Sequence, residues 1–191
     1  FCVVNSLDNY YQGSTFSEGN CKVAMVSGQS DYHVGTFGLT AGKWYWEVKF
    51  TESGSDHTHL AGIVDKVTTG SNAAAHASAY SWMYYGNNGV YKHDGADTSY
   101  GSAWTDGTIL GIALDLTNNK LYFALNNTWQ NSGDPTTGAT GTGAISITAS
   151  SGGQDGVYYP AFQDYDNHAT VTWTVNFGGC SAFSLSSAQN D

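Results

Sequence analysis

Carboxylates are the first candidates for chemistry in this sequence, because glycoside hydrolysis needs two of them facing one cleft. The chain contains only three glutamates, which are Glu18, Glu47 and Glu52. Glu47 and Glu52 are five residues apart, so a continuous strand would point them to opposite faces. The Glu-x-Asp-x-x-Glu strand motif of β-sandwich glycosidases is absent. We therefore interpret Glu47 as a structural carboxylate that accepts hydrogen bonds beneath a loop.

Nucleophilic chemistry also lacks its usual residues. There is no Gly-x-Ser-x-Gly motif, and none of the cysteines lies in an electropositive stretch. The cysteines Cys2, Cys21 and Cys180 are odd in number and form no Cys-x-x-Cys pair, which argues against a zinc site. We interpret them as buried apolar thiols, with a Cys2–Cys21 bridge as the open alternative. The sequence thus predicts a protein that is not an enzyme.

Metal ligands are sparse as well. His57 and His59 share one face if their segment is extended, but no third ligand is nearby, so we interpret them as solvated loop residues. Oxygen-rich loops that suit calcium occur at 93–97 and 164–167, and neither has the EF-hand spacing. We predict no cofactor, with calcium as an alternative.

Charge and composition limit the class of partner. The 191-residue chain has a formal net charge of -10 and contains no arginine. Phosphate recognition depends on Arg and Lys clusters, so nucleic acid is a poor partner, and so is an anionic membrane surface. No apolar run approaches the roughly 18 residues of a membrane span. The chain starts at Phe1, not Met, so we expect a part or processed product of a larger protein.

Alternating apolar residues predict an all-β fold. Residues 43–50 put Trp44, Trp46, Val48 and Phe50 on one face of a strand. A hairpin is predicted over 109–125 with its turn at Thr117-Asn118-Asn119, and another strand over 169–177. Asn126-Asn127-Thr128 has the form of a glycosylation sequon, which we interpret as a turn.

The remaining segments fit loops between such strands. Residues 68–79 predict a loop with one helical turn, and 130–144 predict a long solvated loop. With strand signals about every 10 residues and no composition shift, we predict one domain over 1–191. Its fold class is a two-sheet antiparallel β-sandwich.

Four sequence blocks resemble the SPRY domain family. They are Gly42 to Val48, Tyr85-Gly86 leading to Val90-Tyr91, Gly107 to Asn127, and Tyr158 to Phe162 with Val175 to Gly178. The extension Thr128 to Pro135 is similar to the version found in phage and other microbial virion proteins. The resemblance implies a concanavalin-like jelly roll that binds proteins and has no known catalytic activity.

In the family, loops at one end of the sandwich form the ligand surface. The matching loops here contain 79–82 and 164–167. Tyr and Trp give a large rigid contact area at low entropic cost, which favours those that lie in or beside loops. The predicted ligand-binding residues are Tyr80, Trp82, Trp129, Tyr165, Asp166 and Asn167.

These features predict a binding module of a viral structural protein, such as a phage fibre, spike or capsid decoration. Its partners would be a host surface protein or glycan and other virion proteins, without nucleic acid or membrane insertion. Its place would be the virion or an extracellular surface. Two alternatives stay open: a lectin-like module of a secreted or cell-surface protein, and a structural domain that assembles with copies of itself.

Overall fold

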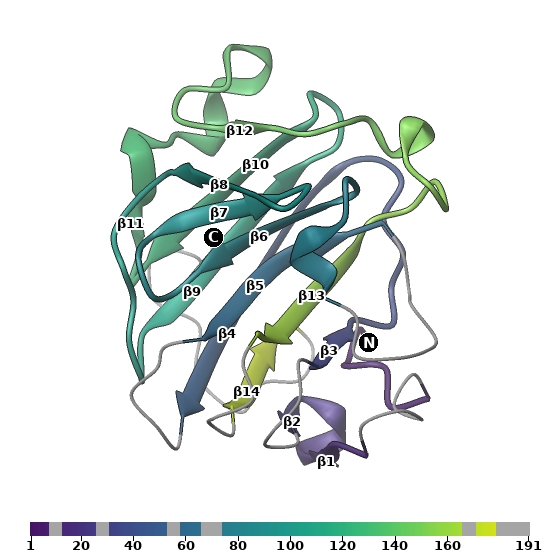
Figure 1. Ribbon diagram of the computed structural model, residues 1–191. Helices are drawn as coiled ribbons and strands as arrows, with labels where there is room; N and C mark the ends of the chain where they lie inside the picture. Colours follow the sequence, from purple (N-terminus) through teal and green to yellow (C-terminus); the bar gives the residue numbers. More distant parts are fainter. Residues whose placement is uncertain (8–12, 26–30, 53–57, 66–73, 166–170, 179–191) are drawn as a thin grey trace.

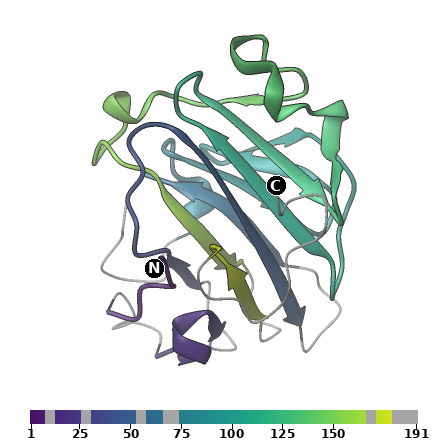
Figure 2. The ribbon, with the colours of Figure 1, turned by 180° about the vertical axis from the view of Figure 1, so that it is seen from behind.

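Two antiparallel sheets packed face to face form the molecule in the computed structural model (Figures 1 and 2). The structure describes residues 1–7, 13–25, 31–52, 58–65, 74–165 and 171–178. One sheet has eight strands in the order β1-β2-β14-β4-β9-β10-β11, with β12 also paired to β10. The other has six, in the order β3-β13-β5-β6-β7-β8. The predicted two-sheet β-sandwich is confirmed.

The strands and short helices have the following bounds. The eight-stranded sheet contains β1 (Thr15–Ser17), β2 (Lys22–Ala24), β4 (Lys43–Glu52), β9 (Ile109–Asp115), β10 (Lys120–Leu125), β11 (Thr128–Trp129), β12 (Ile145–Ser146) and β14 (Val171–Asn176). The six-stranded sheet contains β3 (Asp31–Val34), β5 (His59–Val64), β6 (Ser81–Tyr85), β7 (Val90–His93), β8 (Ala96–Ser99) and β13 (Tyr159–Asp164). The 3₁₀ turns are η1 (Glu18–Asn20), η2 (Ala75–Ala77), η3 (Gln130–Ser132), η4 (Pro135–Thr140) and η5 (Ser150–Gly152).

The main core fills the space between the sheets. On β4, the alternate residues Trp46, Val48 and Phe50 are buried there, as their spacing predicts. Trp104 and Trp173 pack around Phe50 with ring centroids 5.1 and 5.8 Å from it. A second, smaller apolar cluster lies on the outer face of the six-stranded sheet, because Met83 and Tyr85 point away from the main core. That sheet is therefore apolar on both faces.

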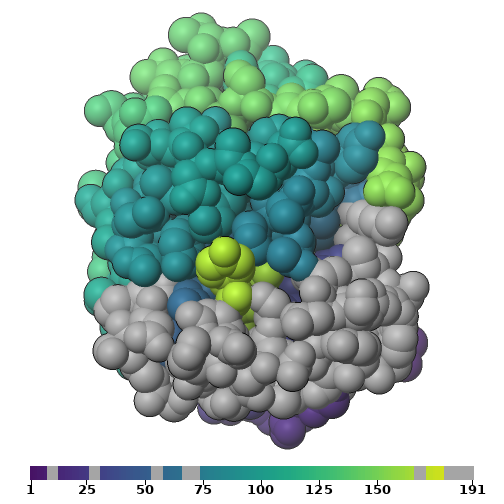
Figure 3. All heavy atoms as spheres, in the orientation of Figure 1, coloured from purple at the N-terminus to yellow at the C-terminus, as the bar shows by residue number. Residues whose placement is uncertain are grey.

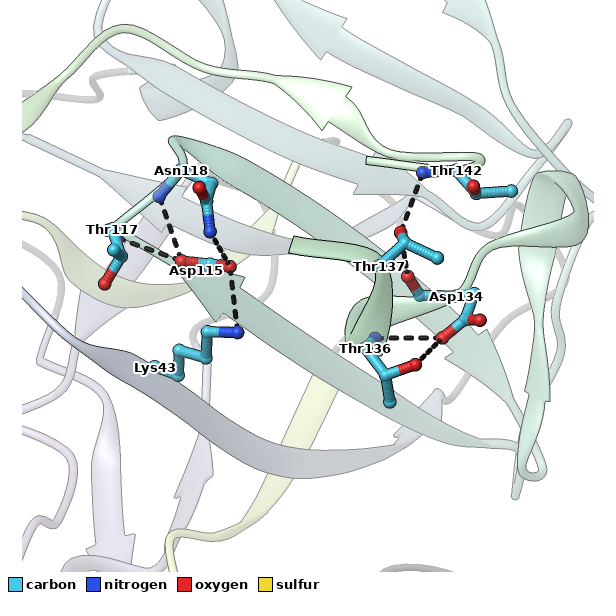
Figure 4. Close-up of polar contacts among 8 residues, drawn as sticks. All are labelled: Lys43, Asp115, Thr117, Asn118, Asp134, Thr136, Thr137 and Thr142. Atoms are coloured by element: carbon cyan, nitrogen blue, oxygen red, sulfur yellow. Dashed lines mark hydrogen bonds and ion pairs between the residues drawn. The ribbon is translucent and has the colours of Figure 1, made fainter. Parts of the chain in front are cut away.

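The predicted turns have identifiable causes. Asn119, Asn126 and Asn127 adopt positive φ angles of 54°, 45° and 69°, which asparagine tolerates better than most residues. In the β9–β10 turn, the Asp115 carboxylate accepts hydrogen bonds from the backbone N–H groups of Thr117 and Asn118 at 2.9 and 3.0 Å (Figure 4). The hairpin predicted over 109–125 is confirmed, and so is the turn predicted at 126–128.

The 130–144 segment is more ordered than predicted. Two 3₁₀ turns, η3 and η4, occupy much of it. The Asp134 side chain caps η4 by accepting from the Thr136 N–H at 2.9 Å, and the Thr137 hydroxyl accepts from the Thr142 N–H at 3.0 Å (Figure 4). The segment is a largely solvent-accessible connection, as predicted, but its own hydrogen bonds hold it in two 3₁₀ turns.

Candidate functional site

The predicted ligand-binding residues lie at different places in the fold. Tyr80 is half-buried and directly precedes β6. Trp129 is half-buried at the end of β11, in the eight-stranded sheet. Tyr165 directly follows β13 and is 40% exposed. Asp166 and Asn167 lie outside the described residues.

Strand register separates Tyr80 from Tyr165. Ser81, beside Tyr80, pairs with Val64 at the end of β5, whereas Asp164, beside Tyr165, pairs with His59 at its start. Five residues of strand span about 17 Å. The expectation that both tyrosines belong to one loop surface is therefore wrong.

Trp82 does not offer a ligand surface. Its side chain is 3% exposed, stacks on the His93 ring at 4.3 Å between centroids and meets the Tyr158 ring at 5.8 Å. The residue belongs to the main core. The prediction of Trp82 as a binding residue is thus wrong, because strand alternation turns its ring inward.

Trp129 lies beside aromatic residues of the eight-stranded sheet, away from Tyr165. Its ring makes edge contacts with Tyr45 and Tyr122 at centroid distances of 6.4 and 6.3 Å. Tyr45 alternates with the core residue Trp46, so it points to the outer face. Trp129 therefore braces the outside of that sheet.

Tyr165 is part of a compact group on the outer face of the six-stranded sheet, which we call the Lys92 cluster. Five of its members lie on η2, β6, β7, β8 and β13, and the sixth directly follows β13. In chain order they are His76, Tyr85, Lys92, Asp97, Gln163 and Tyr165. In Figure 3, the yellow-green surface of the end of β13 lies against the teal surface of the 74–99 region.

A buried ammonium group is the centre of the Lys92 cluster. Lys92 Nζ lies 4.7 Å from the Tyr85 ring centroid and 5.4 Å from that of Tyr165, so both rings provide cation–π contacts. Asp97 Oδ1 accepts from Nζ at 2.7 Å. Strand register makes this pairing possible, because Lys92 and Asp97 are cross-strand partners. Lys92 is buried, whereas the Asp97 side chain is 45% exposed.

His76 packs against Tyr165, the exposed tyrosine of the cluster. Its ring meets the Tyr165 ring edge-on at 4.4 Å. Gln163 Oε1 accepts from the His76 backbone N–H at 3.1 Å and lies 3.2 Å from Nδ1, which therefore carries the ring proton. Burial lowers the pKa of His76 below 6.5, although the hydrogen bond to Gln163 opposes the shift. The imidazole is consequently neutral at pH 7.

This arrangement suits recognition of another molecule. Tyr165 presents a half-exposed ring whose edges are fixed by His76 and Tyr85, the latter at 6.0 Å between centroids. Asp97 adds an exposed carboxylate beside it. A rigid ring with polar neighbours binds with little loss of side-chain entropy.

Sequence reasoning identified Tyr165 as a ligand-binding residue but not the other five members of the cluster, although Asp97 lies in the calcium candidate 93–97. A usable signal existed in residues 90–93, where a lysine follows Val90 and Tyr91 in a short strand. A lysine in such a strand needs a partner for its charge when it is buried. The identity of that partner depends on strand register, which the sequence does not reveal.

A second set of polar residues lies inside the sandwich. Ser14 Oγ donates to Asp31 Oδ2 at 2.7 Å, and His33 Nε2 lies 2.9 Å from Ser14 Oγ and 3.2 Å from Asp31 Oδ2. A catalytic Ser-His-Asp triad uses one imidazole nitrogen for serine and the other for aspartate. Here a single nitrogen faces both oxygens and all three residues are buried, so the group ties β3 to the segment before β1.

His59 corrects another prediction. It is fully buried as the first residue of β5, stacks on Phe50 at 3.5 Å and places Nε2 3.2 Å from the Trp104 carbonyl oxygen. A Cβ at Gly86 would collide with the His59 ring, which explains the glycine of the Tyr85-Gly86 block. The interpretation of His59 as a solvated loop residue is wrong, and His57 lies outside the described residues.

Glu47 is buried and accepts a hydrogen bond from the Tyr45 hydroxyl at 2.9 Å, in agreement with its predicted structural role. Within the described part of the chain, no cluster of three or more His, Cys, Asp or Glu residues could hold a metal ion. In the calcium candidate 93–97, Asp97 pairs with Lys92. In the candidate 164–167, residues 166 and 167 lie outside the described residues. The expectation of no cofactor, with calcium as its alternative, stays a prediction.

The cysteines differ from expectation. Cys2 is a free thiol, whereas Cys21 is disulfide-bonded, so the Cys2–Cys21 bridge is not formed. The interpretation of all three as thiols is wrong for Cys21, and Cys180 lies outside the described residues. No helix among the described residues has the length and apolar character that crossing a membrane requires.

The fold is a two-sheet β-sandwich, and the Lys92 cluster lies on the outer face of its six-stranded sheet. A family model described as the SPRY domain matches residues 43–179, more than half of the chain. The chain belongs to the SPRY domain family. SPRY domains are protein-binding modules and are generally non-catalytic.

Solved structures show the same fold. The SPRY domain of human HERC1 superposes with a TM-score of 0.68 at 16% identity, over 91% of this chain and 96% of that one. Stonustoxin superposes with a TM-score of 0.62 at 18% identity, over 92% of this chain but 27% of that one. These likenesses concern the fold alone. No curated protein sequence matches this chain.

Proposed function

We propose that this domain is a non-catalytic contact module that binds its partner through Tyr165 and the rim of the Lys92 cluster. The observation that carries the proposal is the half-exposed Tyr165 ring, held by His76, Tyr85 and Lys92. Interfaces place their largest energetic contributions on rigid Tyr, Trp and Arg residues, and this chain has no arginine.

We further propose that the module belongs to a viral structural protein, such as a phage fibre, spike or capsid decoration, and contacts a host surface protein or glycan. The disulfide at Cys21 supports a virion or extracellular location, because disulfides persist in oxidising surroundings. The extension Thr128 to Pro135, which resembles phage members, supports the viral assignment.

A paired tyrosine experiment tests the binding face. A random dodecapeptide library is selected on the full chain, and the recovered peptides are titrated against Tyr165→Ala and Tyr80→Ala. We expect Tyr165→Ala to weaken binding about 30-fold, which corresponds to about 2 kcal/mol for a hot-spot residue. The control Tyr80→Ala, at a position about 17 Å away along the direction of β5, should change affinity by less than about threefold. Equal affinities for both variants would contradict the proposal.

The nature of the partner needs a second experiment. Fluorescently labelled chain is added to intact bacterial cells of several species and to a glycan array, with Tyr165→Ala as the matched control. Binding to cells that Tyr165→Ala loses supports host contact. Retention of glycans by the isolated chain favours the lectin-like alternative. Concentration-dependent assembly in sedimentation, with no binding to cells or glycans, favours the structural one.

A further inference from the structure

A separate pocket opens at the other end of β13, and we call it the Trp44 pocket. Its volume is about 350 Å³. The floor contains the buried core residues Leu39 and Trp46, and the walls include Phe37, Trp44, Phe177 and Cys2. Four chain regions far apart in sequence meet here: the first residues, the segment that leads into β4, the start of β13 and the end of β14.

Backbone hydrogen bonds and one side-chain hydrogen bond fix the walls of the pocket. Leu39 and Tyr158 exchange two bonds, with N–O distances of 2.8 and 2.9 Å. The Thr36 N–H donates to the Val3 carbonyl at 2.8 Å, and Trp44 Nε1 donates to the Ala41 carbonyl at 2.7 Å. The pocket is therefore preformed, so a ligand does not have to order its walls.

The lining determines which ligand would fit. None of the described side chains that line the pocket is an acid or a base of the Asp, Glu, Lys, Arg or His type. Burial raises the pKa of the Cys2 thiol, which stays protonated at neutral pH. A charged ligand would lose hydration without gaining a charged side chain as a partner, whereas a neutral ring would gain contacts with Trp44, Trp46 and Phe177.

The volume of the pocket and the exposure of the residues at its mouth narrow the class of ligand further. A cavity of about 150 Å³ lined by apolar residues can bind benzene, so the present volume suits one or two rings. Phe37 and Trp44 are 46% and 43% exposed at the mouth, which is unusual for such large apolar side chains on a free surface. We propose that the Trp44 pocket binds a small, neutral, largely apolar molecule of one or two rings, independently of the Lys92 cluster.

Titration with N-phenyl-1-naphthylamine, a neutral probe that fluoresces in apolar surroundings, tests this proposal on the full chain. Cys2→Phe places a ring in the pocket, whereas Cys2→Ser keeps it open. We expect Cys2→Ser to bind the probe within twofold of the wild type and Cys2→Phe to bind at least tenfold more weakly. Trp44→Ala, at the mouth, should weaken binding about fivefold and serves if Cys2→Phe does not fold.

Two further measurements separate this site from others. The sulfonated counterpart 8-anilinonaphthalene-1-sulfonate should bind the wild type at least tenfold more weakly than the neutral probe. Tyr165→Ala should leave neutral-probe binding unchanged, so failure of the peptide experiment would not affect this one. Equal binding of the neutral probe to the wild type, Cys2→Phe and Trp44→Ala would overturn the proposal. Equal binding of the two probes to the wild type would also overturn it.

Discussion

The Lys92 cluster and the Trp44 pocket lie at opposite ends of β13 and differ in how they could bind. Pro160, near the start of the strand, lines the pocket, and Tyr165 follows its end. The cluster holds a charge that its own residues neutralise and presents one ring to the surroundings. The pocket presents several apolar side chains around an open volume.

This difference separates two uses of aromatic residues. In the cluster, the Tyr85 ring contacts the buried Lys92 ammonium, so this aromatic residue stabilises a charge inside the protein. In the pocket, Trp44 is fixed by one hydrogen bond to Ala41 and its ring is left for other contacts. The cluster is therefore suited to a protein or glycan surface and the pocket to a small molecule. The predictions below test whether the two regions are independent.

The largest effect is expected for Trp46→Ala. Trp46 is 2% exposed and forms part of both the main core and the pocket floor. Truncation of a buried tryptophan costs about 3–5 kcal/mol of unfolding free energy. Urea unfolding followed by circular dichroism measures this loss. A cost below about 1 kcal/mol would show that the floor is not packed as the structure has it.

Lys92→Met should have the next largest effect, at the other region. Methionine keeps the apolar stem but removes the ion pair with Asp97 and the contacts with both tyrosine rings. A cation–π contact and a half-exposed ion pair together contribute about 2 kcal/mol. Urea unfolding should show this loss, while neutral-probe binding in the Trp44 pocket stays unchanged. Loss of probe binding would contradict the independence of the two regions.

Asp115→Asn should lower stability by about 1 kcal/mol at pH 7, because a charged acceptor forms stronger hydrogen bonds. Burial opposes ionisation of Asp115, but hydrogen bonds from Asn118 and the ion pair with Lys43 at 3.4 Å outweigh it and lower the pKa below 3.8. The ionised group stabilises the fold above pH 3.8, and this contribution is lost as the pH falls through the lower folded-state pKa.

Thermal unfolding at several pH values tests the assignment for Asp115. The difference between the wild type and Asp115→Asn should be constant from pH 7 to about 5 and should shrink below pH 3.8. A difference that stays the same down to pH 2 would mean that the carboxylate charge contributes nothing. Asp115 pairs with Lys43, which directly precedes Trp44 in the sequence. The same variant therefore also tests whether this ion pair helps to hold Trp44 at the mouth of the pocket.

The smallest effect concerns His76. Since burial lowers its pKa below 6.5, the unfolded chain binds a proton more readily, and the stability contribution is lost as the pH falls below 6.5. We expect His76→Gln, whose amide can also donate to Gln163, to lose less stability between pH 7.5 and 5.5 than the wild type, by less than about 1 kcal/mol. Parallel pH profiles would show that His76 is not buried against Tyr165.

Most of the fold could be predicted from sequence, because alternation directly reports which face of a strand is buried. β4, β9, β10 and β14 were found in this way, since one face of each carries most of the large apolar residues. The six-stranded sheet was harder, because it is apolar on both faces. Trp82 and Tyr84 fill the main core while Met83 and Tyr85 pack outside, and alternation cannot tell the two pairs apart.

The candidate sites depend on which residues of neighbouring strands are paired, and the alternation of apolar residues in the sequence does not reveal this register. Tyr80 and Tyr165 both lie in loops, yet pairing with opposite ends of β5 separates them. Lys92 and Asp97 meet only because β7 and β8 form a tight hairpin, with Asp94 at a φ of 51° and Gly95 at 73°. The Trp44 pocket needs the end of β14 beside the first residues of the chain, a contact far apart in sequence.

The most direct test of the central claim is a double comparison of Tyr165→Ala and Trp44→Ala. Peptides selected on the wild-type chain and the neutral probe N-phenyl-1-naphthylamine are both titrated against the two variants. The account predicts that Tyr165→Ala loses peptide affinity about 30-fold and keeps the probe, whereas Trp44→Ala loses probe affinity about fivefold and keeps the peptides. If either variant lost both ligands, or neither variant lost any, two independent binding regions would be contradicted.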